Sequence, residues 1–304
     1  MTEHFEVTEE YEGERIDKYL TAQLDTLTRS YLQKLIKSGG ILVNSSPVKS
    51  SYPVVCGDSV SAEIPPAMEP EILAENIPLD VVYEDEDVIL VNKPKGMVVH
   101  PAPGHYTGTL VNALMYHCRG QLSGINGVLR PGIVHRIDKD TTGILIACKN
   151  DLAHNKIAEA LKEHSITREY RAVVYGNLKD EEGSINAPIG RHPTQRLKMA
   201  VAARGGRHAV THYKVLEAFQ GYSYIACRLE TGRTHQIRVH MSSIGHPLVG
   251  DELYGPAKCP FSGLKGQTLH AESLGFVHPR TNEYMEFHAP LPAYFQSLLE
   301  KLRN

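Results

Sequence analysis

An aspartate beside an arginine is the first candidate for chemistry in this chain of 304 residues. Asp138 lies in PGIVHRIDKDTTGILIACK, residues 131–149, where the polar bend 138–143 separates two apolar runs. These runs predict strands at 132–137 and 144–149, joined by the bend. Since side chains alternate along a strand, Arg136 and Asp138 should share one face. The guanidinium would then keep the carboxylate charged, as a nucleophile or base requires.

The local pattern alone favours a simpler interpretation, a surface turn with an ion pair between Arg136 and Asp138, because most such aspartates do no chemistry. A glycosidase pair formed by Asp138 and Asp140 is disfavoured. The two acids are two residues apart on one bend, whereas glycosidase carboxylates must flank a sugar ring.

Four stretches resemble the motifs of RNA pseudouridine synthases of the RluA/RluD type, in the order expected for that family. They are HRIDKDTTGILI (135–146), REYRAVVYG (168–176), GRTHQIRVHMSSIGHPLVGDELYG (232–255) and LHAESLGFVHP (269–279). NKPKGMVVHP (92–101) is similar to a further family segment, so the resemblance covers nearly the whole chain. It implies an enzyme that breaks the uridine N1–C1′ bond, turns the uracil and rejoins it through C5.

The resemblance also implies roles for individual residues. Asp138 would be the catalytic carboxylate, and Arg238 in HQIRVH would pair with it. Tyr170 would stack on uracil and relay the C5 proton. Three further residues would contact the RNA: Arg136 by filling the place of the flipped uridine, Leu269 by lining the pocket, and Arg233 by binding phosphate. Taken without the motifs, Tyr170 would be an ordinary strand tyrosine, Leu269 plain core and Arg238 a helix-surface cation.

The segments predict an α+β protein with a mixed, largely antiparallel sheet, because many β runs occur without regular β–α alternation. A helix at 151–162 would turn Leu152, Ile157, Ala160 and Leu161 to the core. Another is expected at 234–243, and residues 190–207 read as an exposed basic loop. Alternating patterns predict paired strands at 209–219 and 222–230.

The chain divides into a small N-terminal module, a linker and a catalytic domain, with expected bounds 1–66, 67–78 and 79–304. The linker is placed at the proline-rich PPAMEP, residues 65–70. The N-terminal pattern of two short helices and β pieces resembles the S4 RNA-binding module. The resemblance implies that Arg29, Lys34 and Lys37, on or beside its second helix, contact RNA phosphates.

Composition bounds the partners. The formal net charge is −3, but the stretch from Gly183 to Glu217 holds six basic residues and no acid between its ends, which indicates a basic face for a polyanion. Five scattered cysteines without a CxxC pair indicate a reducing cytosol. No apolar run is long enough to cross a membrane, and the start resembles no targeting signal. Two groups of histidines are considered as zinc ligands, at positions 235, 240 and 246 and at positions 270 and 278. Their spacings do not match those of dedicated zinc sites.

We therefore expect a cytoplasmic, monomeric enzyme that isomerises uridines in structured RNA, with large-subunit (23S) ribosomal RNA as the expected substrate. No redox change occurs in this reaction, so neither cofactor nor metal is expected. Alternatives are a synthase acting on tRNA, a non-catalytic RNA-binding or ribosome-assembly factor with the same fold, and a nucleoside hydrolase. The hydrolase is disfavoured because so small a substrate makes no use of basic tracts.

Overall fold

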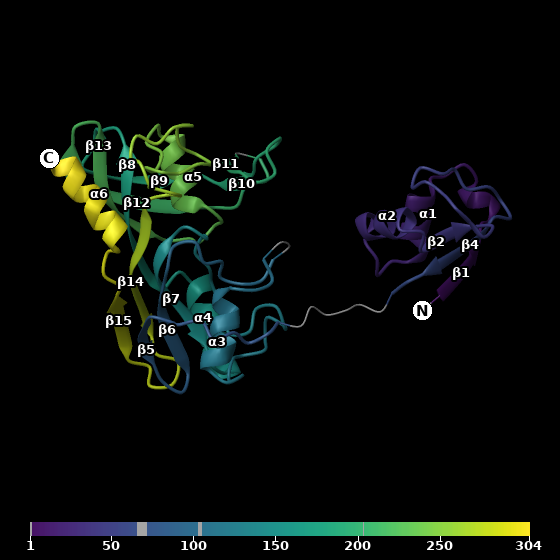
Figure 1. Cartoon of the computed structure of the whole chain (residues 1–304), viewed down its shortest axis with the longest axis horizontal. Helices are drawn as coiled ribbons and strands as arrows, with labels where there is room; N and C mark the ends of the chain where they lie inside the picture. The colour runs from purple at the N-terminus through teal and green to yellow at the C-terminus, as the bar shows by residue number, and fades with distance from the viewer. Residues whose placement is uncertain (1, 66–71, 103–104, 203) are drawn as a thin grey trace. The chain divides into compact units, whose positions relative to one another are not determined.

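The computed structural model describes residues 2–65, 72–102, 105–202 and 204–304. The chain forms two compact units, Met1–Glu69 and Pro70–Asn304, drawn in Figure 1. In the described part of the chain, no helix is both long and apolar enough to cross a membrane. The first part of the predicted linker, residues 67–71, lies outside the described residues.

The first unit contains two helices and a four-stranded antiparallel sheet in the described residues, with strand order β1-β4-β2-β3. Its elements are β1 (Thr2–Glu6), the 3₁₀ turn η1 (Glu9–Tyr11), α1 (Ile16–Gln23), α2 (Arg29–Lys37), β2 (Ile41–Val43), β3 (Ser46–Pro47) and β4 (Ser59–Glu63). Thr28 caps α2, since its side chain accepts a hydrogen bond from the Tyr31 N–H at the start of the helix. The stripe formed by Ile16, Tyr19 and Leu20 is buried in the core of this unit. Strand β1 was not predicted.

The second unit is built on a mixed sheet that has nine strands within the described residues. Its path runs β5-β6-β7-β14-β8-β13-β12-β9, and β15 pairs with β14. The strands are β5 (Val81–Glu84), β6 (Val88–Lys93), β7 (Thr142–Cys148), β8 (Thr167–Tyr175), β9 (Glu182–Asn186), β12 (Val210–Phe219), β13 (Tyr222–Leu229), β14 (Leu269–Val277) and β15 (Tyr284–His288). Among the described ladders only β7 with β14 is parallel. The expectation of an α+β fold with a largely antiparallel sheet is confirmed.

The parallel contact of β7 with β14 depends on one glycine. Gly143 has φ +110°, and a Cβ there would collide with the backbone of Ala271. Every residue of β7 is buried, as expected for an apolar strand in the middle of a sheet. This strand begins directly after the bend that carries Asp138.

Four helices of the second unit lie within the described residues: α3 (Leu110–His117), α4 (Asp151–Lys162), α5 (Gln236–Ser243) and α6 (Ala293–Arg303). Figure 1 shows α3 and α4 on the same side of β6 and β7. Helix α6 closes a separate small core, in which Phe295 packs edge-on against Tyr224 of β13. The helices predicted at 151–162 and 234–243 are confirmed, although α5 begins at Gln236.

The predicted first strand at residues 132–137 is wrong. The segment forms one isolated bridge, between Ile133 and Ala147. The backbone N–H of Ile146, which a strand partner would take, instead donates to Nε2 of His135 at 3.1 Å. A side chain thus replaces the expected ladder, and the chain approaches Asp138 as an irregular extended segment.

Three further expectations need correction. Residues 190–207 are not only loop, since β10 (Ile189–Arg191) pairs with β11 (Met199–Val201). Leu152 is exposed, because it lies on the outer side of α4 while Ala153 and Ile157 are buried. The end of the expected linker is packed on α3: Ile72 is buried in the main core, and Glu75 bonds the backbone of Asn112.

Candidate active site

A cavity of about 990 Å³ opens in the second unit, where the start of β7, the start of β14 and the middle of β8 lie side by side. The loop before α5 closes another of its walls. Asp138, Tyr170, Arg238, Leu269, Arg136 and Arg233 all line it. The structure thus brings together the six residues predicted for the second unit, although they lie up to 133 positions apart in the sequence.

The bend that carries Asp138 is held from beneath by a buried lysine. The ammonium of Lys93 donates to the carbonyls of Pro94, Met97 and Lys139 at 2.9–3.0 Å. The Lys139 carbonyl also accepts from the Gly96 N–H. Burial lowers the pKa of Lys93 to about 7. These bonds tie the bend to the segment after β6 and fix the direction of the Asp138 side chain.

Arg238 holds the Asp138 carboxylate through one oxygen. Its Nη1 donates to Asp138 Oδ2 at 2.9 Å, while Nε and Nη2 donate to both oxygens of Asp251 at 2.6 and 2.9 Å. Asp251 is 2% exposed and also accepts the backbone N–H groups of Leu253 and Tyr254. The two aspartates raise the pKa of Arg238 against the effect of its burial. The expected partner Arg136 forms no ion pair within the described residues, so that interpretation of the local pattern is wrong.

The second oxygen of Asp138 accepts no hydrogen bond from a described residue. The nearest basic group is Nε2 of His235, 3.7 Å from Oδ1. His235 precedes α5 with a left-handed backbone (φ 58°), and its Nδ1 lies 2.8 Å from the Tyr254 hydroxyl. That hydroxyl accepts the Met199 N–H, so its own proton is directed to Nδ1. This arrangement leaves the proton of a neutral His235 on Nε2, facing Asp138.

Tyr170 and Leu269 form the apolar wall. Tyr170 lies on β8, is 7% exposed, and is paired with Ala271 and Cys227 of the neighbouring strands. Burial raises the pKa of its hydroxyl. Leu269, the first residue of β14, is 5% exposed. These two side chains give one wall of the cavity an apolar surface on which a flat ring can pack.

The rest of the cavity wall is strongly basic. Besides Arg238 it carries six cationic side chains and, within the described lining, no acid other than Asp138: Arg130, Arg136, Lys162, Arg168, Arg207 and Arg233. Arg233 donates through Nε to the His208 carbonyl, and Arg136 is exposed. A mildly acidic protein thus presents one basic concavity, which suits a polyanion.

Comparison with known proteins shows the family to which the chain belongs. The RNA pseudouridylate synthase family model matches residues 87–243, and the S4 domain model matches residues 14–60. The chain belongs to the RNA pseudouridylate synthase family. It is 54% identical to the RNA pseudouridine synthase YlyB of Bacillus subtilis (strain 168), over 98% of this chain and 97% of that protein.

A relative named for a ribosomal substrate is similar over nearly its whole length. Identity to the ribosomal large subunit pseudouridine synthase D of Zymomonas mobilis is 46%, covering 99% of this chain and 98% of the relative. Among solved structures, human RNA pseudouridylate synthase domain containing 1 matches with a TM-score of 0.58 and 26% identity, over 76% of this chain and 96% of that one. The chain is therefore an isomerase that forms pseudouridine.

In the N-terminal unit of the synthase, the three predicted RNA-binding cations differ. Arg29 donates to both oxygens of Asp17, whose side chain is fully buried and also bonds Arg15 and Gln33. These donors lower the pKa of Asp17. Lys34 and Lys37 are exposed and form no ion pair within the described residues. Arg29 thus serves the fold, while the two lysines remain available to phosphates.

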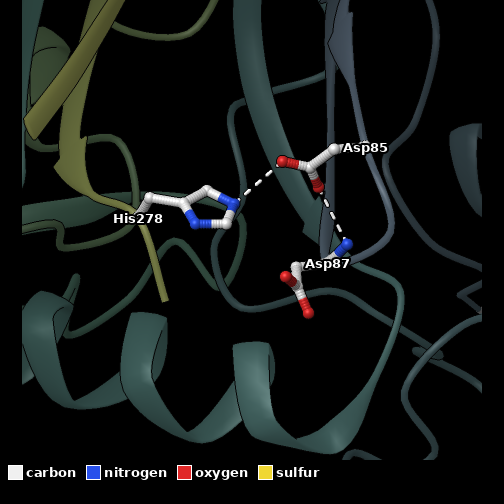
Figure 2. Close-up of side chains that lie close together, drawn as sticks. All are labelled: Asp85, Asp87 and His278. Atoms are coloured by element: carbon white, nitrogen blue, oxygen red, sulfur yellow. Dashed lines mark hydrogen bonds and ion pairs between the residues drawn. The ribbon is translucent and has the colours of Figure 1, made fainter. Parts of the chain in front are cut away.

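A second group of acids lies beside the turn between β5 and β6, at the opposite end of β7 from Asp138. Asp85, Asp87 and His278 bring possible ligand atoms within 4.8 Å of one another. Figure 2 shows His278 directed at Asp85, which also accepts the Asp87 N–H. Arg280 donates to both oxygens of Asp87 at 2.6 and 2.7 Å and holds its pKa at about 2. The arginine supplies the positive charge that a metal ion would bring, so the group is explained without one.

The histidines considered for zinc bind separate partners. His240 lies against Thr211 and the Ala187 carbonyl, and His270 against Thr142 and the Ala289 carbonyl, with both ring nitrogens used in each case. His246 contacts the Tyr175 carbonyl. These rings therefore tie strands and helices together and do not converge on a common point.

Sequence reasoning missed several groups that shape the cavity: Asp251, Tyr254, His235, Arg168 and Lys93. All lie inside the stretches that carry the resemblance, such as GDELYG for Asp251 and NKPKG for Lys93. Their roles could not be read there, because each acts through a partner distant in the sequence.

Proposed function

We propose that the synthase isomerises specific uridines of large-subunit ribosomal RNA with Asp138 as its catalytic carboxylate. The observation that carries the proposal is the sharing of Arg238. Asp251 binds two of its nitrogens and Asp138 only one, so one Asp138 oxygen at the cavity wall accepts no hydrogen bond from a described residue. A carboxylate in this state can attack the sugar, add to the base or remove a sugar proton.

The neighbouring groups fit the steps that follow. Tyr170 and Leu269 offer an apolar surface on which the freed uracil can turn without leaving the cavity. The Tyr170 hydroxyl has no hydrogen-bond partner among the described residues, so it is free to relay the proton that leaves C5. Arg136 is exposed at the rim, where its planar guanidinium can fill the space that the flipped uridine leaves in the RNA stack.

The RNA substrate is supported by the charge of the cavity and by the S4 match. A uridine must leave its stack to reach Asp138, at a cost of about a few kcal/mol. Contacts of the exposed cations Arg130, Lys162 and Arg207, and of the half-buried Arg233, with phosphates offset this cost. Relatives named as large-subunit synthases favour ribosomal RNA over tRNA.

The proposal needs no cofactor, because the substrate is neither oxidised nor reduced. Every proposed catalytic group comes from one copy of the chain, which supports the expectation of a monomeric enzyme. Its action on ribosomal RNA would be cytoplasmic.

Tritium release tests the substrate. Unmodified large-subunit rRNA and bulk tRNA, each transcribed with [5-³H]uridine, would be incubated with the enzyme at equal uridine concentration. The C5 hydrogen is released only when a bond forms at C5. We expect release from the ribosomal RNA and little from the tRNA. Release from tRNA alone would overturn the ribosomal assignment, and mapping of the modified positions would then follow on the active RNA.

A further inference from the structure

One buried cation of the cavity wall has no partner for its charge. Arg168 lies on β8, is 6% exposed and lines the cavity. Its Nη2 makes one long bond, 3.4 Å, to the Glu230 carbonyl, and its buried Nε has no hydrogen-bond partner. No described carboxylate pairs with it, although burying an unpaired charge is costly. Such a site is complete only when an anionic or strongly polar oxygen binds.

The neighbouring residues show that this arrangement is specific to the cavity side of the strand. Arg171, on the opposite face of β8, is paired with Glu169 and Glu272. On the cavity side, Gly232 makes room for Arg168: a Cβ at Gly232 would lie 2.7 Å from Nη1. Of the two arginines on β8, Arg171 is therefore neutralised by acids, whereas Arg168 has no acidic partner among the described residues.

The reaction produces an anion in this cavity. When the N1–C1′ bond breaks, its electron pair leaves with the uracil. Asp138 loses its charge, whether its oxygen bonds to C1′ or C6 or takes a proton from C2′. In each route the negative charge passes from Asp138 to the uracil, where it is spread over the ring and its carbonyl oxygens. When C5 bonds to C1′, Asp138 regains the charge; the C5 proton then leaves through the Tyr170 hydroxyl and N1 takes up a proton, so the product uracil is neutral.

Arg168 is placed to receive that charge. It lies two residues before Tyr170 on one face of β8, about 7 Å along the strand, and thus beside the wall on which uracil would rest. Arg238 cannot serve, because it is held by Asp251 and Asp138. Lys93 cannot either, because three carbonyls take its bonds.

We propose that Arg168 donates hydrogen bonds to a carbonyl oxygen of the departing uracil and stabilises it as an anion. This inference rests on the proposed function and adds a catalytic residue to it. The guanidinium acts as an oxyanion hole for the freed base, and its unfilled donors in the RNA-free enzyme are the sign of that role.

The test compares Arg168→Gln with Arg171→Gln, a matched loss of one arginine from the outer face of the same strand. Single-turnover tritium release from the RNA should fall about 10²–10³-fold for Arg168→Gln, as for loss of an oxyanion-hole donor. RNA affinity should change by less than about threefold. Arg171→Gln should keep its rate, and Arg168→Lys, which retains the charge without the planar fork, should lie in between.

RNA with 5-fluorouridine at the target position separates anion stabilisation from a structural role. Fluorine withdraws electrons and stabilises the uracil anion by itself, so breakage of the N1–C1′ bond should depend less on Arg168. Nucleoside analysis after nuclease digestion would measure that breakage, since fluorine blocks the final loss at C5 only. We expect the loss for Arg168→Gln to shrink to less than about tenfold.

The outcomes distinguish the two proposals. The role of Arg168 would be overturned if Arg168→Gln lost the same rate on the uridine RNA and on the 5-fluorouridine RNA. It would also be overturned if a loss of RNA affinity explained the whole fall in rate, or if Arg168→Gln kept a normal rate. If Arg168→Gln does not fold, as thermal unfolding would show, Arg168→Lys carries the same comparison. A silent wild-type enzyme would refute the proposed function itself.

Discussion

Two clusters in the second unit of the synthase join aspartates to an arginine, and they differ in what they leave open. At the cavity, Arg238 is shared by two carboxylates, and one oxygen of Asp138 accepts no hydrogen bond from the residues that the structure describes. At the other end of the sheet, Arg280 gives both of its bonds to Asp87, and His278 covers Asp85. The first cluster borders a cavity, whereas the second joins the β5–β6 turn to the segment after β14.

The difference lies in the number of donors for each acceptor. Asp87 receives Arg280 and Asn150, which satisfies both of its oxygens, while Asp138 receives a single guanidinium nitrogen. A fully satisfied carboxylate stabilises the fold and gives no reactive oxygen. The same contrast holds for cations, because Arg29 is bound by Asp17 whereas Arg168, Lys34 and Lys37 have no acidic partner in the described part of the chain.

Among variants of the groups that hold the two clusters, Asp138 itself aside, the largest effect is expected for Asp251→Asn. This change would remove the charge that binds two nitrogens of Arg238, so the guanidinium would turn and Asp138 would lose its orientation. Misplacement of this order lowers rates by about 10²-fold. Single-turnover tritium release measures it, with RNA affinity as the control. A normal rate would mean that Arg238 positions Asp138 without Asp251.

Lys34 and Lys37, the exposed lysines of the N-terminal unit, should affect RNA binding and not stability. In Lys34→Gln/Lys37→Gln, two phosphate contacts are lost, so the slope of log affinity against log salt should fall by about 1–2. Filter binding at several salt concentrations measures the slope. Arg29→Gln is the matched control and should lower thermal stability with little change of slope. The reverse result would show that Arg29, not the lysines, faces the RNA.

The ion pair between Arg280 and Asp87 should make the stability of the protein depend on pH. Arg280 lowers the pKa of Asp87 to about 2, so the stabilisation is present above about pH 4 and disappears as the pH falls through 2. Arg280→Gln should therefore lower the melting temperature near pH 7 by about 2–4 °C, and by less at pH 3. An equal loss at both pH values would contradict the ion pair as its cause.

The smallest effect is expected for added metal ions. Because Arg280 already neutralises Asp87, about 1 mM Mg²⁺ or Zn²⁺ should leave the melting temperature of the wild-type protein unchanged. A rise that Asp85→Asn removes would show that the group binds a metal despite the arginine.

Much of the fold was accessible from the sequence because its signals are local. Thr28 and Gly39 bound α2, and alternation marks β12 and β13. The strand predicted at 132–137 failed because His135 takes the Ile146 N–H that a ladder would use. The hairpin of β10 and β11 was missed because each strand has only three residues, too few to show alternation, within an otherwise basic segment.

In the candidate site, too, some residues could be found from the sequence and others could not. Asp138, Tyr170, Arg238 and Leu269 were selected through motif resemblance, and the structure brings them to one cavity. The local pattern instead suggested Arg136 as the partner of Asp138, because spacing cannot show that Arg238 arrives from 100 positions away. Nothing in the sequence indicated the importance of Arg168 either. Arg168 stands out because no described carboxylate lies beside it in the folded protein, and a sequence cannot show this.

The central claim is that the open oxygen of Asp138 does the chemistry. The most direct test is tritium release from [5-³H]uridine-labelled large-subunit rRNA by wild type and Asp138→Asn, with RNA affinity and thermal unfolding measured in parallel. We expect the variant to fold and bind RNA, with a release rate below about 10⁻⁴ of wild type. Release by Asp138→Asn within about tenfold of wild type would contradict the assignment of Asp138.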